Sequence, residues 1–306
     1  MKTVEIVEVG ARDGLQNEKV HFSTEQKVEL INKAVEAGVK RLEVASFVHP
    51  KLVPQMADAE AVIADLPDNP DIEYIGLVLN KRGYLRALAT REGNKRGVDE
   101  VGCVVTASDT FGQKNQGQNR AETIAEAGAI MKLAKTDGVG AQVTISTAFG
   151  CPFEGKVNAT TVLDMAKELA DFTPREIAIA DTIGVGVPNQ VEDILASIKE
   201  AVPHIPLRAH FHNTRNTGIA NAWAAYKGGA TVLDSSVAGL GGCPFAPRAT
   251  GNIGTEDLLY LLSQSDVQTG VNLDKMIELA RWIETILERP APSAVSQAGG
   301  FPEPTV

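Results

Sequence analysis

Eight short runs rich in β-branched residues recur along the chain, and the intervals between them carry helical patterns. This alternation predicts strand–helix units and a parallel sheet, because parallel neighbours need a crossover between them. Eight such strands close a (β/α)8 TIM barrel, and 306 residues suit that α/β fold as one domain. The expected strands lie near residues 5–10, 41–47, 74–79, 101–106, 141–147, 176–181, 207–212 and 231–237.

A doubly wound open sheet is the competing fold. It would need a glycine-rich fingerprint after the first strand, and Gly-Ala-Arg-Asp-Gly at residues 10–14 is not one. Two further helical patterns follow the eighth strand, up to residue 262 and over 273–287. We therefore expect a catalytic barrel with extra C-terminal helices over residues 1–289. Residues 290–306 are rich in Pro, Ala, Ser and Gly and are expected to form a flexible tail.

The charge balance limits the partners of the chain. It has 29 basic and 39 acidic residues, a net charge of -10, which argues against nucleic-acid or anionic-membrane binding. An anionic ligand must therefore meet a local basic cluster. Three cysteines do not make a disulfide framework, and no signal core or run of 18 apolar residues is present. These features predict a cytoplasmic protein with no membrane contact.

Two of the five histidines, His210 and His212, lie two residues apart in the seventh expected strand. Residues with this spacing share one face of a strand, so the two imidazoles make half of a metal site, while Phe211 between them faces the packing. Two strand histidines that bond only to their neighbours are the ordinary alternative. The pair therefore indicates a metal site only if other ligands join it.

Other charged residues fall at strand ends, where barrels of this type build their active sites. The first strand runs into Arg12 and Asp13, the second carries Glu43, and the sixth ends in Asp181. Charges within apolar strands are costly unless they are paired or bound to a cation, and structural ion pairs at the rim are the competing explanation. A carboxylate, two imidazoles and an amide oxygen suit Mg²⁺ or Mn²⁺, and would also accept Zn²⁺ or Co²⁺.

The segment after the eighth strand, residues 239–251, holds four glycines, two prolines and Cys243. This composition favours a mobile loop over a site, although a plain glycine-rich turn would have the same composition. A thiol on a closing loop can exchange a proton with substrate. Cys151 has a similar Gly-Cys-Pro context but adjoins a strand end, where a small buried thiol is common, and Cys103 is expected in the core.

Several long motifs of the chain resemble those of the 3-hydroxy-3-methylglutaryl-CoA lyase family, one of the DRE-TIM metallolyases. They cover residues 7–18 (Val-Glu-Val-Gly-Ala-Arg-Asp-Gly-Leu-Gln-Asn-Glu), 46–48, 54–56 and 181–186, and the Gly-Gly-Cys-Pro loop that ends in Gly251-Asn252. The resemblance extends over about residues 4–287. It implies metal-assisted retro-Claisen cleavage of an acyl-CoA substrate, 3-hydroxy-3-methylglutaryl-CoA, to acetyl-CoA and acetoacetate, in a homodimer or higher homo-oligomer.

The resemblance also implies roles for individual residues. A divalent cation, Mg²⁺ or Mn²⁺, would be the cofactor. Its implied ligands are Asp13, His210, His212 and Asn252. The implied catalytic residues are Arg12 beside the thioester carbonyl, Cys243 for proton transfer, and Glu43, Asp181 and His210 as acid/base or orienting groups. The implied substrate-binding residues are Arg12, Gln16, Ser46 and Thr182.

Departures from the family pattern leave the acyl substrate open. His49 and Leu52 replace a common serine and tryptophan, and Asn213 and Arg215 depart near the mouth. His49, Asn213 and Arg215 would meet a CoA phosphate or a second carboxylate, or lie on solvated surface. A lyase for a related thioester such as citramalyl-CoA is thus the nearest alternative. A Claisen condensing synthase would be expected to continue into a further domain, and an inactive barrel used as a binding protein would be expected to have lost a ligand or the loop cysteine.

Overall fold

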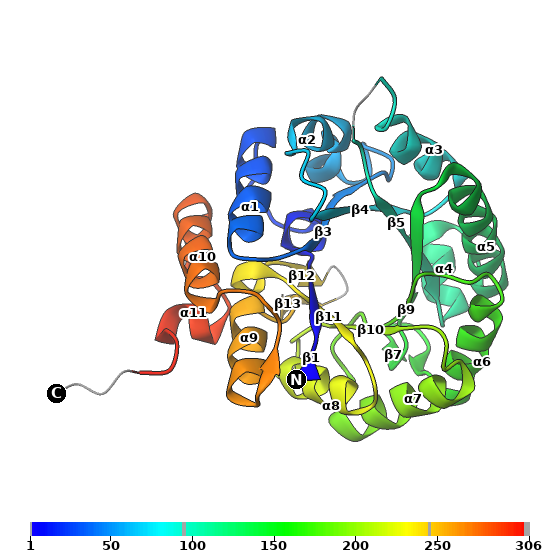
Figure 1. The fold of residues 1–306 in the computed structure, drawn as a ribbon. Helices are drawn as coiled ribbons and strands as arrows, with labels where there is room; N and C mark the ends of the chain where they lie inside the picture. Colours follow the sequence, from blue (N-terminus) through cyan, green and yellow to red (C-terminus); the bar gives the residue numbers. More distant parts are fainter. Residues whose placement is uncertain (1, 94–95, 244–245, 303–306) are drawn as a thin grey trace.

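The protein forms a closed barrel of parallel strands surrounded by helices (Figure 1). The computed structural model describes residues 2–93, 96–243 and 246–302, apart from the side chains of residues 243 and 246–250. The order of strands around the barrel is β10-β11-β2-β3-β4-β5-β6-β9. These strands are β2 (Glu5–Glu8), β3 (Arg41–Ser46), β4 (Glu73–Val78), β5 (Glu100–Thr106), β6 (Gly140–Ser146), β9 (Ile177–Asp181), β10 (Leu207–Phe211) and β11 (Val232–Ser235). The predicted (β/α)8 barrel and its eight strands are confirmed.

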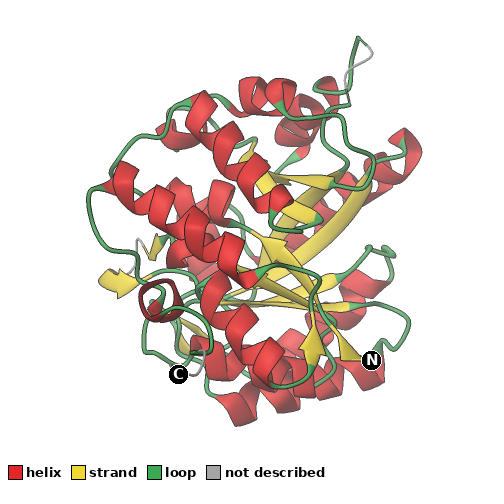
Figure 2. Ribbon diagram, turned by 60° about the vertical axis from the view of Figure 1, so that its left-hand side comes forward, coloured by secondary structure: helices red, strands yellow, loops and turns green. Residues whose placement is uncertain are grey.

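Helices form the outer layer, which covers the strands on all sides in Figures 1 and 2. They are α1 (Thr24–Glu36), α2 (Ala59–Asp65), α3 (Lys81–Ala89), α4 (Asp109–Gln116), α5 (Arg120–Asp137), α6 (Ala159–Ala170), α7 (Pro188–Ala201), α8 (Gly218–Lys227), α9 (Thr255–Gln264), α10 (Leu273–Leu287) and α11 (Ala294–Ala298). Short strand pairs lie outside the barrel: β1 (Lys2–Thr3) with β14 (Val267–Gln268), β7 (Gly150–Cys151) with β8 (Gly155–Lys156), and β12 (Gly242–Cys243) with β13 (Ala246–Thr250). None of the described helices is long and apolar enough to cross a membrane.

The helices begin and end where local chemistry requires it. Ser23 and Gln26 form a capping box at the start of α1, and Asn119 and Glu122 form one at the start of α5. Each box pairs a backbone N–H of the first turn that has no partner within the helix. Helix α5 then ends at Gly138, whose φ of 65° is the left-handed conformation that glycine adopts readily.

The end of the chain packs against the barrel instead of hanging free. The carboxylate of Asp257 accepts hydrogen bonds from the hydroxyl of Ser293 at 3.1 Å and from the backbone N–H of Val295 at 2.7 Å. The backbone N–H of Ser293 also donates to Ala238 O at 3.2 Å. Within the tail that was predicted to be flexible, residues 291–298 therefore pack against the barrel, because the half-buried Asp257 binds the start of α11.

A network of charged side chains fills the interior of the barrel at the end where the strands begin. Arg41 of β3 contacts Glu100 of β5 at 2.6 Å and Glu176 at 2.8 Å, and Glu176 contacts Arg208 of β10 at 3.1 Å. All four side chains are at most 2% exposed. Each buried charge thus has opposite charges around it, which is the condition under which buried ions are tolerated.

Replacement of Arg41 by Met should destabilise the fold strongly. The variant leaves Glu100 and Glu176 buried without this partner, and we expect its free energy of unfolding to fall by about 3–5 kcal/mol in urea denaturation. Arg289→Met removes an exposed ion pair with Glu18 and should cost about 1 kcal/mol or less. Equal losses in the two variants would contradict a special role for the buried network.

Candidate active site

A cavity of about 450 Å³ opens at the C-terminal ends of the barrel strands. Side chains from β3, β6, β9, β10 and β11 line it, together with the connections that follow β2, β3 and β11. Polar lining residues face apolar ones such as Leu77 and Val104 across the space. The cavity lies on the face that carries function in barrels of this type.

The connection after β2 supplies Arg12 and Asp13. Both residues lie on a single-turn π-helix, η1 (Gly10–Gly14), and not within the strand as their sequence position suggested. A Cβ on Gly14 would lie 2.7 Å from the hydroxyl oxygen of Ser236, so only glycine lets this turn pack so closely. π-Turns of this kind are often found at functional sites, where they turn side chains toward a ligand.

Arg12 bridges two carboxylates at the base of the cavity. Its Nη1 donates to Asp13 Oδ1 at 2.7 Å, and its Nε donates to Glu43 Oε1. The strand pairing of β3 with β4 shifts register at Glu43, and such a bulge re-aims a side chain. The predicted proximity of Arg12, Asp13 and Glu43 is confirmed.

The two histidines face the same cavity as Asp13. The Nε2 atoms of His210 and His212 each lie 3.8 Å from Asp13 Oδ2, and their ring centroids are 5.2 Å apart. Asn252 joins them, because its Nδ2 donates to Asp13 Oδ2 at 2.8 Å and its backbone bridges to His212. Phe211 points the other way and packs against Phe149, as predicted.

This cluster fits a divalent cation on its own chemistry. The possible ligand atoms of Asp13, His210 and His212 lie within 4.8 Å of one another. Asn252 Oδ1 and His212 Nδ1 are buried and have no hydrogen-bond partner among the described residues, a state that is costly without a ligand. Burial and the neighbouring His210 lower the pKa of His212 to about 4, which keeps that ring neutral, as metal binding requires.

Gly241 allows Asn252 to reach this position. Its φ is 128°, and a Cβ on it would lie 2.9 Å from Asn252 Nδ2. The predicted glycine-rich loop forms the hairpin β12–β13, whose Gly242 lines the cavity and accepts a hydrogen bond from Asn17 Nδ2 at 3.2 Å. The thiol of Cys243 lies outside the described residues.

Asp234 orients His210 from the side away from the cluster. His210 Nδ1 lies 3.0 Å from Asp234 Oδ2, and Asp234 Oδ1 accepts from Arg208 Nε at 2.5 Å. A carboxylate bonded to one imidazole nitrogen fixes the ring and leaves the other nitrogen for a metal. Our sequence reasoning missed both residues. The signals were present, since Arg208 precedes His210 by two residues and the charged Asp234 directly follows the apolar pair Val232-Leu233.

Two buried glutamates hold the segments that carry the site. Glu8 Oε1 accepts from the backbone N–H of Gly10 at 2.7 Å and of Val237 at 2.9 Å, which joins η1 to η3 (Val237–Gly239). Glu256 accepts from Ala238 N–H at 2.9 Å. Burial raises the pKa of Glu8 to about 7 and that of Glu256 to about 8. Sequence reasoning did not single out either residue.

Some predicted site residues lie elsewhere. Asp181 is fully buried, does not line the cavity, and accepts from the backbone N–H groups of Val185 and Gly186 at 3.0 and 2.8 Å. Asp181 thus shapes the turn after β9, and its role as an acid/base or orienting group stays a prediction. Ser46 is also fully buried and does not line the cavity, whereas Gln16 and Thr182 do.

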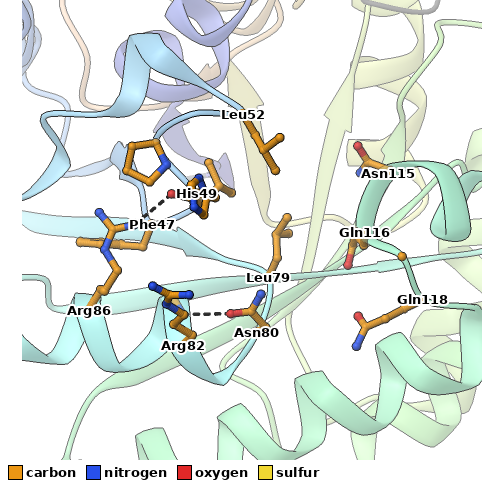
Figure 3. Close-up of a pocket in the computed structure, with 14 residues that line it drawn as sticks. Phe47, His49, Leu52, Leu79, Asn80, Arg82, Arg86, Asn115, Gln116 and Gln118 are labelled. Carbon is orange, nitrogen blue, oxygen red and sulfur yellow. Dashed lines mark hydrogen bonds between the residues drawn. The ribbon is translucent and has the colours of Figure 1, made fainter.

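Two residues near the cavity mouth that depart from the family pattern bond to neighbouring loops. Arg215 donates to the carbonyls of Ile183 and Gly184, and Asn213 accepts from Gly218 N–H. Both therefore stabilise loops. His49 and Leu52, which also depart from the family pattern, instead line a cavity of about 670 Å³ (Figure 3).

Comparison with known families settles the relationship. The HMGL-like family model matches residues 3–283. The chain belongs to the HMGL-like family. It is 41% identical over 297 residues to the mitochondrial hydroxymethylglutaryl-CoA lyase of Macaca fascicularis, covering 97% of this chain and 90% of that lyase.

Two other relatives of this HMGL-like protein are named for an acyl-CoA substrate or were solved with coenzyme A. The (R)-citramalyl-CoA lyase of Chloroflexus aurantiacus is 40% identical over 309 residues, covering 98% of this chain and 96% of that enzyme. An HMG-CoA lyase structure from Acinetobacter baumannii, in complex with coenzyme A and 3-methylmalate, has a TM-score of 0.90 at 36% identity and covers 99% of this chain and 98% of its own.

Asp234→Asn should weaken Mn²⁺ binding by about 10–100-fold, because His210 loses the carboxylate that orients its ring. Isothermal titration of the metal-free protein with Mn²⁺ measures the change, and far-UV circular dichroism checks the fold. Asp193→Asn on α7 is the matched control and should bind Mn²⁺ like the parent. Unchanged affinity in Asp234→Asn would remove the orienting role.

Stability of this HMGL-like protein should fall as the pH rises from about 4.5 to about 8. Glu256 has a pKa raised from 4.5 to about 8 in the folded state, so the unfolded chain releases the proton first and gains stability with pH. Glu256→Gln keeps an acceptor for Ala238 and should reduce this slope by about half in urea denaturation, because Glu8, with its pKa raised to about 7, still contributes below that pH. Glu278→Gln, on the exposed side of α10, should leave the slope unchanged. A slope in Glu256→Gln as steep as that of the parent would show the prediction to be wrong.

Proposed function

We propose that this protein is a carbon–carbon lyase that cleaves 3-hydroxy-3-methylglutaryl-CoA to acetyl-CoA and acetoacetate. One observation supports this most: a guanidinium, Arg12, adjoins the Asp13–His210–His212 cluster at the base of a cavity. Retro-Claisen cleavage needs both parts, a group that activates the C3 hydroxyl and a cation that stabilises the enolate. The likeness to hydroxymethylglutaryl-CoA lyases supports the same reaction.

The chain's own groups hold the acyl end in place. Asp13, His210, His212 and Asn252 would hold Mg²⁺ or Mn²⁺. When bound there, the cation would draw in the C3 hydroxyl and distal carboxylate of the substrate and lower the pKa of that hydroxyl. Arginines and carboxylates pair with one another through the interior from Arg41 up to Asp13 in the described structure. Among them are Arg12, Arg41, Arg208, Asp13, Glu43, Glu100, Glu176 and Asp234.

Arg12 stabilises the developing enolate. When the C2–C3 bond breaks, its electron pair moves into the thioester and places negative charge on the carbonyl oxygen, while the C3 oxygen becomes the ketone of acetoacetate. A fixed guanidinium stabilises this oxygen better than water does. Glu43 and Asp13 hold Arg12 in position from either side, so it needs no reorganisation during the reaction.

Two proton transfers complete the reaction. The C3 hydroxyl proton passes to the carboxylate of Asp13, which keeps lone pairs beside the cation, or to His210 Nε2 in a step in which that nitrogen does not bind the cation; Asp234 keeps this nitrogen aimed at the cluster. Cys243 gives a proton to C2 of the enolate to form acetyl-CoA; its neighbour Gly242 lines the cavity. Gln16 and Thr182 contact the acyl group, and the buried Oε1 of Gln16 has no partner in the described structure.

Citramalyl-CoA is the second candidate substrate. The specific observation in its favour is the 40% identity to an (R)-citramalyl-CoA lyase over nearly the whole of both chains. Its cleavage uses the same metal cluster and the same arginine, so the geometry above suits either thioester. The comparison of acetyl-CoA release from both thioesters decides between them.

Arg12→Gln should lower kcat for the cleaved thioester about 100–1,000-fold, because the enolate loses its fixed cation. Cys243→Ser should lower kcat strongly as well, since a serine hydroxyl is a weaker proton donor. Coupled detection of acetyl-CoA release, with and without chelator, measures both effects. Chelation should abolish release, and added Mg²⁺ or Mn²⁺ should restore it.

Arg281→Gln, on the exposed side of α10, is the matched control and should retain the parent rate. Near-parent rates in Arg12→Gln or Cys243→Ser would rule out the role given to that residue. No acetyl-CoA from either thioester would overturn the proposed function.

A further inference from the structure

The connection after β11 contains a strained residue close in sequence to the candidate metal ligand Asn252. Ala238 has a φ of 61° and a ψ of 4°, the left-handed conformation that residues with a Cβ avoid. Gly239, which follows it, is also left-handed, with a φ of 64°. A strained alanine keeps such a conformation only where its surroundings fix it, and residues of this kind are concentrated at functional sites.

Contacts from two other parts of the chain hold Ala238. Its backbone N–H donates to Glu256 Oε1 at 2.9 Å and to Oε2 at 3.2 Å, and its carbonyl accepts from the backbone N–H of Ser293 at 3.2 Å. Ala238 and Glu256 are fully buried and Ser293 is 1% exposed, so water does not compete for these groups. The strained conformation therefore depends on α9, which carries Glu256, and on the C-terminal segment, residues 291–298.

The C-terminal segment reaches this connection by close packing. Helix α11 lies beside α9 and α10 in Figure 1. A Cβ on Gly239 would lie 3.2 Å from Ser293 N, and a Cβ on Gly254 would lie 2.8 Å from Ser293 Cβ. Ser293 therefore packs against both ends of the stretch that carries Asn252, and glycine at each end makes this approach possible.

The connection leads directly to the carboxamide of Asn252. The carbonyl of Leu240, two residues after Ala238, accepts from Asn252 Nδ2 at 3.2 Å. The same nitrogen donates to Asp13 Oδ2 at 2.8 Å, so its two hydrogens have acceptors and the rotation of the carboxamide is fixed. Asn252 Oδ1 is buried and has no partner among the described residues, which leaves this oxygen for a cation.

We propose that the C-terminal segment positions the metal ligand Asn252. Ser293 holds the turn at Ala238 in its strained conformation, and this turn places the Leu240 carbonyl where it fixes the carboxamide. Ser293 does not line the active-site cavity, so it is a positioning residue and not a catalytic one. The inference rests on the proposed function, because it takes Asn252 as a ligand of the bound cation.

Replacements of Ser293 separate its backbone N–H from its hydroxyl. Ser293→Pro removes the N–H that holds Ala238, and proline adopts the observed φ of -62°. This variant should bind Mn²⁺ about tenfold more weakly in calorimetric titration of the metal-free protein, because the ligand is less firmly held. Ser293→Ala is the matched control: it keeps the N–H and should bind Mn²⁺ like the parent. Far-UV circular dichroism checks the fold of each variant.

Ala238→Gly tests the strain itself. Glycine adopts the left-handed conformation readily, so the turn no longer needs Ser293 to hold it. The double variant Ala238→Gly/Ser293→Pro should therefore recover Mn²⁺ affinity to within about threefold of the parent. General damage to the C-terminal segment would not be repaired by this change. If Ser293→Pro does not fold, an ester in place of the amide between Pro292 and Ser293, introduced by ligation of a synthetic C-terminal peptide, removes the same N–H without a new ring.

Parent-like Mn²⁺ affinity in Ser293→Pro overturns the inference, as does an equal loss in Ser293→Ala or a loss that Ala238→Gly does not repair. The binding measurement is independent of cleavage. If no thioester is cleaved but Ser293→Pro weakens binding and Ala238→Gly restores it, the inference stands and the proposed function falls. If a thioester is cleaved, saturating Mn²⁺ should restore kcat of Ser293→Pro. A parent protein that cleaves a thioester but binds no Mn²⁺ overturns the inference while the cleavage stands.

Discussion

The site depends on a line of buried charges along the barrel axis. Arg41 at the bottom binds Glu176, which binds Arg208, which binds Asp234, which in turn holds His210 at the top. Each link is an ion pair in a low-dielectric interior, where removal of one partner leaves the next uncompensated. The orientation of a candidate metal ligand is therefore tied to contacts in the barrel floor.

This arrangement follows from the two-residue period of strands. Arg208 and His210 of β10 and His212, which directly follows the strand, occupy successive inward positions, one layer above another. Most barrels fill such layers with branched apolar side chains. Here paired charges fill the lower layers, and the side chains with spare ligand atoms fall in the uppermost layer, where the cavity opens. The polar side chains that stabilise the barrel and those that form the candidate site therefore alternate with the same two-residue spacing along the chain.

Much of this was predictable because it depends on local pattern. The eight strands follow from β-branched runs, and the meeting of Asp13, His210, His212 and Asn252 follows once those strands form a barrel. A strand-end carboxylate such as Asp181 can face the cavity or its own turn, and only the tertiary structure shows that it binds the backbone N–H groups of Val185 and Gly186. The packed tail was missed because its partner, Asp257, lies far back in sequence.

The sequence by itself determined the fold class, the family motifs and the residue types that meet at one end of the barrel. These features depend on the periodicity of apolar residues and on the order of the strands, and both can be recognised from the spacing of residues that are close in sequence. The tertiary structure decided which polar groups are paired and which are left with spare atoms. It pairs Asp181 with its own turn and places Asp234 behind His210, because pairing depends on distances between strands and helices that no local pattern encodes.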